Sequence, residues 1–207
     1  MASAASAVSR PACAQRVYVY GPAPAPPPPP PPPYYRPYYV YREPPYAFVL
    51  GVDFDGAAPV STPQFADGND LKGGGGMKIR AGERIRLQPG LHITPEVGYG
   101  YTHLFATDDN GNAYDWDLHR IFAGARLEIG RFFVPALYGH VGYGWQVTGD
   151  PTVQGTDGPS FDVGGALDLR VIPHLGLGVH VEYVTVAAEH DSIDWVAVGL
   201  HASIVFF

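Results

Sequence analysis

The feature that most constrains this chain is an alternation of apolar and polar residues that recurs along residues 46–207. A period of two places the apolar side chains of a strand on one face and the polar ones on the other. Eight such runs can be traced, at about 46–55, 77–87, 92–104, 116–129, 133–147, 160–171, 174–187 and 194–207. No run approaches the 18 apolar residues of a membrane helix, although strands of about 10 residues can cross a bilayer.

The connections between these runs alternate in length. Long polar connections are expected at 56–76, 105–115, 148–159 and 188–193, and tight links at 88–91, 130–132 and 172–173. Long loops on one side and short turns on the other are typical of bacterial outer-membrane barrels. An even number of strands returns the last beside the first and closes the sheet. The pattern therefore predicts an all-β fold, an eight-stranded antiparallel up-and-down transmembrane β-barrel.

The two faces of the predicted strands differ sharply. One face is apolar, as in the run from Phe48 through Leu50 and Val52 to Phe54, and the other is small or charged. The charged face holds seven acidic and seven basic residues, predicted to pair in the lumen: Asp53, Asp55, Lys78, Arg80, Arg84, Arg86, Glu96, Arg120, Arg126, Glu128, Asp162, Asp168, Arg170 and Glu182. The interior of eight strands is only just wide enough for side chains, so a filled, ion-paired lumen is expected.

A soluble barrel would show the same alternation with the faces reversed, and the aromatic residues favour the membrane reading. Those next to long loops are Tyr99, Tyr101, Tyr114, Trp116, Tyr143, Trp145, Tyr183 and Trp195, whereas Phe206 and Phe207 lie at the opposite level. Two aromatic belts around an aliphatic band are what bilayer interfaces select. All ten residues are therefore predicted to lie at the membrane interfaces.

The amino-terminal residues have a different character. Residues 1–14 are interpreted as a truncated signal-peptide remnant, because Ala12-Cys13-Ala14 has the small-x-small form of a cleavage site, with an ordinary disordered N-terminus as the alternative. Residues 15–45 are predicted to form a disordered proline- and tyrosine-rich tail in the periplasm. Its eight prolines, Pro26 to Pro33, form a polyproline II rod in this interpretation. The tail is interpreted as a spacer, with a ligand for an aromatic-lined groove or a contact with the cell wall as the alternatives.

Residues 46–207, the predicted barrel domain, resemble small outer-membrane barrels of the OmpA/OmpX type, down to the terminal Phe207. The resemblance implies the outer membrane of a Gram-negative bacterium, with its lipids and lipopolysaccharide as partners. It also implies recognition by the barrel-assembly machinery through the last strand, which ends at Phe207. In the family pattern the terminal Phe shares its face with apolar residues, but here Val205 and Ser203 occupy those positions. Either a bulge in the last strand or an imperfect assembly signal is expected.

Candidate chemistry is sparse. His201 and Ser203 share a face with Glu182 in the neighbouring strand, which looks like the His-x-Ser arrangement of barrel-type lipid A deacylases. Satisfied interior polar residues are the favoured interpretation, so no catalytic residue is assigned. Asp108 to Asn112 has carboxylates at calcium-loop spacing but lacks the closing Glu, and Gly73 to Gly76 has no phosphate-loop lysine. No metal and no cofactor are expected.

The formal charge of −7 and the lack of a basic stripe argue against nucleic acid as a partner. Two functions remain. The first is a non-enzymatic barrel with acidic external loops and a structural or surface-interaction role. The second is a narrow, porin-like conduit for small or apolar molecules.

Overall fold

The computed structural model describes residues 21, 44–61, 70–107, 113–147, 157–187 and 192–207. In the strands, the backbone alone is described for residues 70, 71, 106, 107, 113 and 114. The predictions made for the signal-peptide remnant, the polyproline rod and the loop from Asp108 to Asn112 concern residues outside these ranges.

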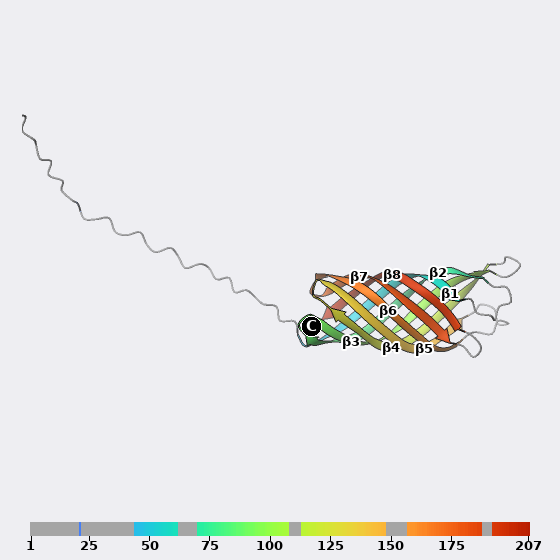
Figure 1. Ribbon diagram of the computed structural model, residues 1–207, viewed down its shortest axis with the longest axis horizontal. Coiled ribbons are helices and arrows are strands. Elements are labelled where there is room, and N and C mark those ends of the chain that lie inside the picture. The colour runs from blue at the N-terminus through green and yellow to red at the C-terminus, as the bar shows by residue number, and fades with distance from the viewer. Residues whose placement is uncertain (1–20, 22–43, 62–69, 108–112, 148–156, 188–191) are drawn as a thin grey trace, which may run out of the picture. The chain divides into compact units, whose positions relative to one another are not determined.

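Eight antiparallel strands form one closed barrel in sequence order (Figure 1). They are β1 (Tyr46–Ser61), β2 (Asp70–Gln88), β3 (Leu91–Thr107), β4 (Ala113–Ile129), β5 (Phe133–Val147), β6 (Asp157–Ile172), β7 (Leu175–Ala187) and β8 (Ser192–Phe206). Each strand pairs with its sequence neighbours, and β8 closes the sheet against β1. The predicted eight-stranded up-and-down barrel is confirmed. No helix within the described residues is long and apolar enough to cross a membrane.

The strands are staggered around the barrel. A path of paired residues that starts at Val49 and crosses every strand returns to β1 at Pro59, ten residues further along. This stagger requires strands that are strongly tilted against the barrel axis, as Figure 1 shows. A barrel of eight strands has an interior that side chains can fill, so whatever faces inward is packed.

The strands extend beyond the predicted runs, most of all on either side of the first long connection. β1 continues to Ser61 and β2 begins at Asp70, so the expected loop at 56–76 is much shorter in the structure. Gly73 to Gly76 lie within β2. Because glycine has no side chain, these residues do not show the alternation of apolar and polar side chains by which the strands were predicted. At Gly74 a Cβ atom would come within 1.8 Å of the His103 carbonyl oxygen, so the close approach of β2 and β3 requires glycine there.

Two short turns, at 88–91 and 130–132, lie side by side at one end of the barrel. Gly90 and Gly130 have φ values of 80° and 121°, a region that favours glycine. The Gly130 amide donates a hydrogen bond of 2.7 Å to the Gly90 carbonyl. Phe48 pairs with Phe206, so the first and last strands also reach this end, which is called the turn end below. The opposite end is called the loop end.

The register of the last strand against β7 is unbroken throughout, and its register against β1 is unbroken from Phe206 to Trp195. Against β1 it then shifts once, because Pro59 pairs with Trp195 and Ser61 with Asp194. The extra residue of this irregularity lies in β1, so the described part of the last strand carries no bulge of its own near Phe206. Phe206 points outward and Val205 is buried in the interior. The apolar outer register of this strand ends at Phe206, one residue before the terminal Phe207.

The barrel is apolar outside and polar inside. The side chains of Leu137, Leu200 and Val163 on the outer wall are more than 60% exposed, whereas Arg84 and Asp168 in the interior are 3% and 5% exposed. Water would penalise such an exterior, because soluble proteins rarely expose large contiguous apolar surfaces. A soluble barrel would have its charged face outside and its apolar face inside, and this structure has the opposite arrangement.

Candidate functional site

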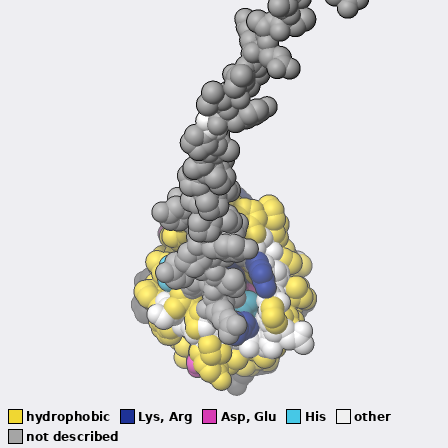
Figure 2. All heavy atoms as spheres, turned by 90° about the vertical axis from the view of Figure 1, so that its left-hand side faces the viewer, with side chains coloured by type: hydrophobic (Ala, Val, Ile, Leu, Met, Phe, Trp, Pro, Cys, Tyr) yellow, Lys and Arg dark blue, Asp and Glu magenta, His cyan; other side chains and the backbone are white. Residues whose placement is uncertain are grey.

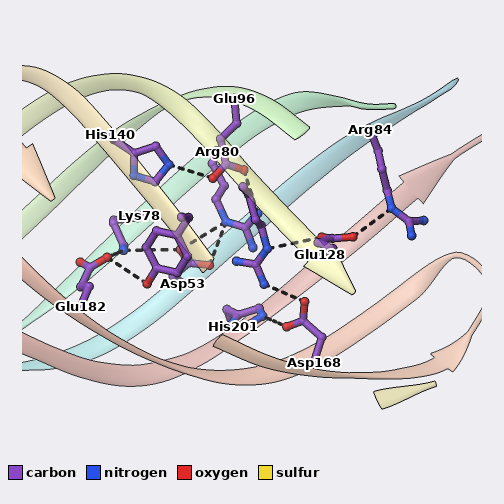
Figure 3. Close-up of polar contacts among 12 residues, drawn as sticks. Asp53, Lys78, Arg80, Arg84, Glu96, Glu128, His140, Asp168, Glu182 and His201 are labelled. Atoms are coloured by element: carbon purple, nitrogen blue, oxygen red, sulfur yellow. Dashed lines mark hydrogen bonds and ion pairs between the residues drawn. The ribbon is translucent and has the colours of Figure 1, made fainter. Parts of the chain in front are cut away.

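The most unusual part of this molecule is its interior, where charged side chains from all eight strands meet. Successive residues of a strand point to opposite sides, so inward positions recur at every second residue. These positions carry buried Asp, Glu, Lys, Arg and His side chains instead of a hydrocarbon core. Ion pairs join most of them into two clusters, which Figure 3 shows together.

The first, called the loop-side cluster, is centred on β1 and β2. Arg80 contacts Asp53 at 3.3 Å and Glu96 at 3.2 Å. Lys78 pairs with Glu182 and lies 3.7 Å from Asp53. Each cation thus bridges two carboxylates from different strands, which ties the strands together across the barrel.

His140 extends the loop-side cluster on β5. Its Nε2 lies 2.8 Å from Glu96, and its Nδ1 lies 2.6 Å from Asp162. Asp162 also pairs with Arg120 at 2.8 Å. An imidazole held between two carboxylates can donate from both nitrogens only in its protonated form. Nearby, His180 lies 3.8 Å from Asp55.

The second, called the turn-side cluster, is centred on Glu128. This carboxylate lies 2.9 Å from Arg84, 2.8 Å from Arg170 and 3.4 Å from Arg126. Arg126 also pairs with Asp168 at 2.7 Å, and Asp168 forms a hydrogen bond with His201. Three guanidiniums therefore converge on two carboxylates near the turn end.

The predicted lumen residues all lie on the inward face of their strands. Thirteen of them take part in the ion pairs described above, and Arg86 lies on the same face of β2 as Arg84, nearer the turn end. Two interior partners were not predicted from the sequence. Tyr138 donates a 3.2 Å hydrogen bond to Glu182, and His92 lies 2.8 Å from Arg84. Both stand at inward positions, so the alternation that located the charges could have located them too.

Above the loop-side cluster the interior becomes apolar. Nine buried side chains form what is called the apolar plug: Ala57, Leu104, Trp116, Leu118, Val184, Val186, Ile193, Trp195 and Ala197. The prediction that Trp116 and Trp195 lie at the membrane interface is therefore wrong. Their exposed fractions are 6% and 3%, because both point into the barrel. Trp116 is an even number of residues from the inward Arg120 on β4, and Trp195 is an even number of residues from the inward His201 on β8.

The other loop-end aromatics lie on the outer wall. Tyr99, Tyr101, Tyr143 and Tyr183 point outward, and Trp145 stacks on His119 with ring centroids 5.7 Å apart. Their neighbours include acidic residues, since Tyr101 donates a 2.7 Å hydrogen bond to Asp117. At the turn end, Phe206 and Phe207 are about half exposed, at 48% and 47%. The side chain of Tyr114 lies outside the described residues.

The interior contains little empty space. Two cavities of about 10 Å³ each are found, room for about one water molecule. One lies beneath the plug beside Lys78 and Trp195, and the other lies at the turn end beside Arg84 and Arg170. Loop-side residues such as Lys78 line the first cavity, and turn-side residues such as Arg84 line the second.

The deacylase-like residues are not assembled for catalysis. His201 Nε2 is bonded to Asp168, and among the described residues no hydrogen bond joins His201 to Ser203. Glu182 is engaged by Lys78 and Tyr138. All three lie in the interior, away from an acyl chain at the outer wall. Within the described ranges no group of three or more His, Cys, Asp or Glu side chains could hold a metal ion.

No protein-family model and no curated protein sequence matches the chain. Among solved structures, the outer membrane protein OprG from Pseudomonas aeruginosa matches with a TM-score of 0.51 and 11% identity, over 77% of this chain and 95% of that chain. Neisserial surface protein A matches with a TM-score of 0.49 and 12% identity, over 77% and 95% of the two chains. The similarity to OprG is a similarity of fold. The chain has the fold of small eight-stranded outer-membrane barrels, and the predicted resemblance is confirmed at that level.

Proposed function

We propose that this chain is a non-enzymatic barrel of a Gram-negative outer membrane with a structural or surface-interaction role. The observation that carries the proposal is the reversed polarity of the barrel. Its outer wall is aliphatic between two aromatic levels, and its interior holds the charges. In a bilayer every backbone polar group needs a partner, which a closed barrel supplies.

The orientation follows from the connections. The turn end carries the short links and both described ends of the barrel, so it faces the periplasm together with the tail (residues 15–45). The long connections then face outward with their acidic residues. Outer-membrane lipids and lipopolysaccharide surround the wall. The exposed Phe206 and Phe207 of the last strand are the part offered to the barrel-assembly machinery, and the tail reaches the cell wall.

The structural role is preferred to the conduit because of what fills the lumen. Passage of a small molecule would require breaking buried ion pairs in both clusters and moving the apolar plug. Opening one buried pair costs several kcal/mol when its partner is left alone, about 3–5 kcal/mol in typical cases. A lumen with several such pairs has no low-energy open path, so the loops and the outer wall are left to make contacts.

Fractionation of cells that express the full chain tests the proposal. The protein should be found with outer membranes, resist extraction by salt, and run faster on gels before boiling than after it. Replacing the outward Val163 and Leu200 with Arg should abolish membrane insertion, because an arginine on the lipid face costs about 2–4 kcal/mol near the midplane. Their inward neighbours Gly164 and Gly199 are crowded and make poor controls, so Lys72→Gln at the loop end is the matched control. A wild-type protein that stays soluble without detergent would refute membrane insertion.

A further inference from the structure

One sector of the outer wall, formed by the loop-side halves of β3, β4 and β5, changes its chemistry along the strands. Paired outward residues form rows across these three strands. In order toward the loop end, the rows are Val97 with Ala123 and Val141, Tyr99 with Ile121 and Tyr143, Tyr101 with His119 and Trp145, and His103 with Asp117 and Val147. This β3–β5 sector therefore passes from aliphatic residues through aromatic rings to a row with a carboxylate.

The aromatic rings of the sector are packed against one another. Trp145 stacks on His119 with an interplanar angle of 16°, and the Tyr101 ring lies 5.3 Å from His119 between centroids. The Tyr99 hydroxyl forms a hydrogen bond with His119 Nδ1, and the Tyr99 ring lies 6.5 Å from Trp145. Tyr99 is nevertheless 37% exposed. The rings thus form a fixed platform with accessible surface on the outside of the barrel.

Carboxylates lie directly beyond this platform. Asp117 accepts a 2.7 Å hydrogen bond from Tyr101 and forms one of 2.8 Å with His103, both through Oδ1. Asp115 lies 3.5 Å from His103 Nε2, and its side chain is 69% exposed. In the described parts of β3, β4 and β5 no lysine or arginine points outward. Apart from its histidines, the charge of the sector is therefore negative.

Other parts of the outer wall differ from this sector. On the opposite side of the barrel, Asp194 of β8 accepts hydrogen bonds of 2.8 Å from Ser61 and 3.0 Å from Ser192, both through Oδ2. Hydroxyl groups thus already bind this carboxylate. Figure 2 looks onto the turn end and shows hydrophobic side chains around most of its rim. Stacked rings beside a largely exposed carboxylate are therefore a local feature of the β3–β5 sector.

We propose that the β3–β5 sector binds a lipid whose headgroup carries an ammonium group. The ammonium lies over the rings of Tyr99, Tyr101 and Trp145, where the negative face of an aromatic ring attracts a cation. Asp115 and Asp117 supply the opposite charge and accept hydrogen bonds from the ammonium. The proposal rests on the membrane location proposed above.

The order of the rows favours a lipid over a dissolved cation. A lipid whose acyl chains lie on the aliphatic row of Val97, Ala123 and Val141 has its headgroup at the level of the rings and carboxylates. Aromatic side chains commonly occupy this boundary between the headgroups and the acyl chains. A dissolved cation would contact only the rings and carboxylates and would gain nothing from the aliphatic row.

The test measures which lipid lies against Trp145. The full chain is reconstituted in vesicles of phosphatidylethanolamine mixed with galactosyl diacylglycerol, whose headgroup is uncharged, and each lipid in turn carries brominated chains. The Trp145 signal is the part of the wild-type quenching that disappears in Trp145→Phe. Its dependence on lipid composition gives the relative affinity of the sector for the two lipids. The variants are Asp115→Asn, Asp115→Asn with Asp117→Asn, and Asp194→Asn as the matched control on the opposite side.

Wild type and Asp194→Asn should prefer phosphatidylethanolamine by about threefold or more, the combined effect of an exposed ion pair and an exposed cation–π contact. Asp115→Asn should lower this preference about twofold, and the double variant should bring it close to one. Asp115 is largely exposed, so its single variant should fold even if the double variant does not.

Equal affinity for the two lipids in wild type, or a preference that Asp115→Asn leaves unchanged, would overturn the proposal. A change in Trp145 emission on addition of soluble ethylammonium, without a lipid preference, would also overturn it and indicate a site for a dissolved cation. Quenching of Trp145 by neither brominated lipid would instead refute the membrane location, and with it this site. That result distinguishes failure of the proposed function from failure of the headgroup site alone.

Discussion

The two ends of the barrel interior are closed by different physics. At the loop end, nine apolar side chains led by Trp116 and Trp195 exclude water by packing. At the turn end, Arg84, Arg126 and Arg170 close the space by ion pairs with Glu128 and Asp168. Packing depends on shape and is indifferent to charge, whereas the ion pairs depend on each partner being present. The ends should therefore respond differently to the same kinds of substitution.

The largest effect is expected from the apolar plug. Trp195→Ala should lower the free energy of unfolding by about 3–5 kcal/mol, because it removes one of the two buried indole rings of the plug and leaves a cavity. Urea unfolding in lipid vesicles measures this. Trp145→Ala removes the same side chain from the outer wall, where it stacks on His119, and should cost about 1 kcal/mol. Equal losses at the two positions would show that Trp195 does not pack in the interior.

The second largest effect on stability is expected from the ion pairs of the turn-side cluster. Arg126→Ala should cost about 2–4 kcal/mol, because Asp168 and Glu128 both lose a buried partner. Asp168→Ala in the same background should cost much less than in wild type, since the pair is already broken. Arg131→Ala, an exposed arginine outside the cluster, should change stability by less than about 0.5 kcal/mol. Additive losses for Arg126 and Asp168 would contradict the pairing.

The positions of the tryptophans can be read from lipid quenching. In variants with one tryptophan each, and Phe at the other two positions, brominated lipids should quench Trp145 strongly. Trp116 and Trp195 should be protected, because the barrel wall separates them from the acyl chains. Strong quenching of Trp195 would place it outside the barrel and remove the apolar plug.

The smallest effect concerns the rim of the loop end. Hydrogen bonds from His103 and Tyr101 hold the pKa of the Asp117 carboxyl below its usual value of 3.8. A lowered folded-state pKa adds stability above the unfolded pKa, and this stability is lost as the pH falls through the folded value. Carboxyl NMR titration should show the Asp117 pKa rising in His103→Ala, while the lowered pKa of Asp194, which does not depend on His103, stays unchanged. An Asp117 pKa that is the same in His103→Ala as in wild type would exclude the hydrogen bond from His103 as the cause of its lowering.

The sequence predicted the barrel and its faces because alternation is a direct consequence of strand geometry. Charged residues such as Arg80, Arg126 and Asp168 could be placed inside because other polar residues lie two or four positions away in the same strand, and so on the same face. The partner of each charge could not be predicted. It depends on the stagger that brings Lys78 beside Glu182 across the barrel, and neither residue is near the other in sequence.

The errors have equally physical causes. The long loops beside Trp116 and Trp195 predict the level of these residues along the barrel, whereas their odd or even position in the strand decides that they face inward. Level and face are independent, and an aromatic ring near a loop can seal the lumen as well as meet the lipid. The sequence predicts a loop at Gly73 to Gly76 because glycine has no side chain to alternate, yet these residues lie within β2, where the close approach of β3 requires glycine at Gly74.

The paired charges and the apolar plug should together keep the lumen closed, and a conductance measurement shows whether they do. The wild-type protein in planar bilayers should show no sustained open state. Trp195→Ala alone should stay closed as well, because the two clusters still block the path. Opening should require loss of the plug and of the clusters together, as in Trp195→Ala with Arg80→Ala and Arg126→Ala. Steady, ohmic channels from the wild-type protein would show that the charged clusters and the apolar plug do not close the lumen.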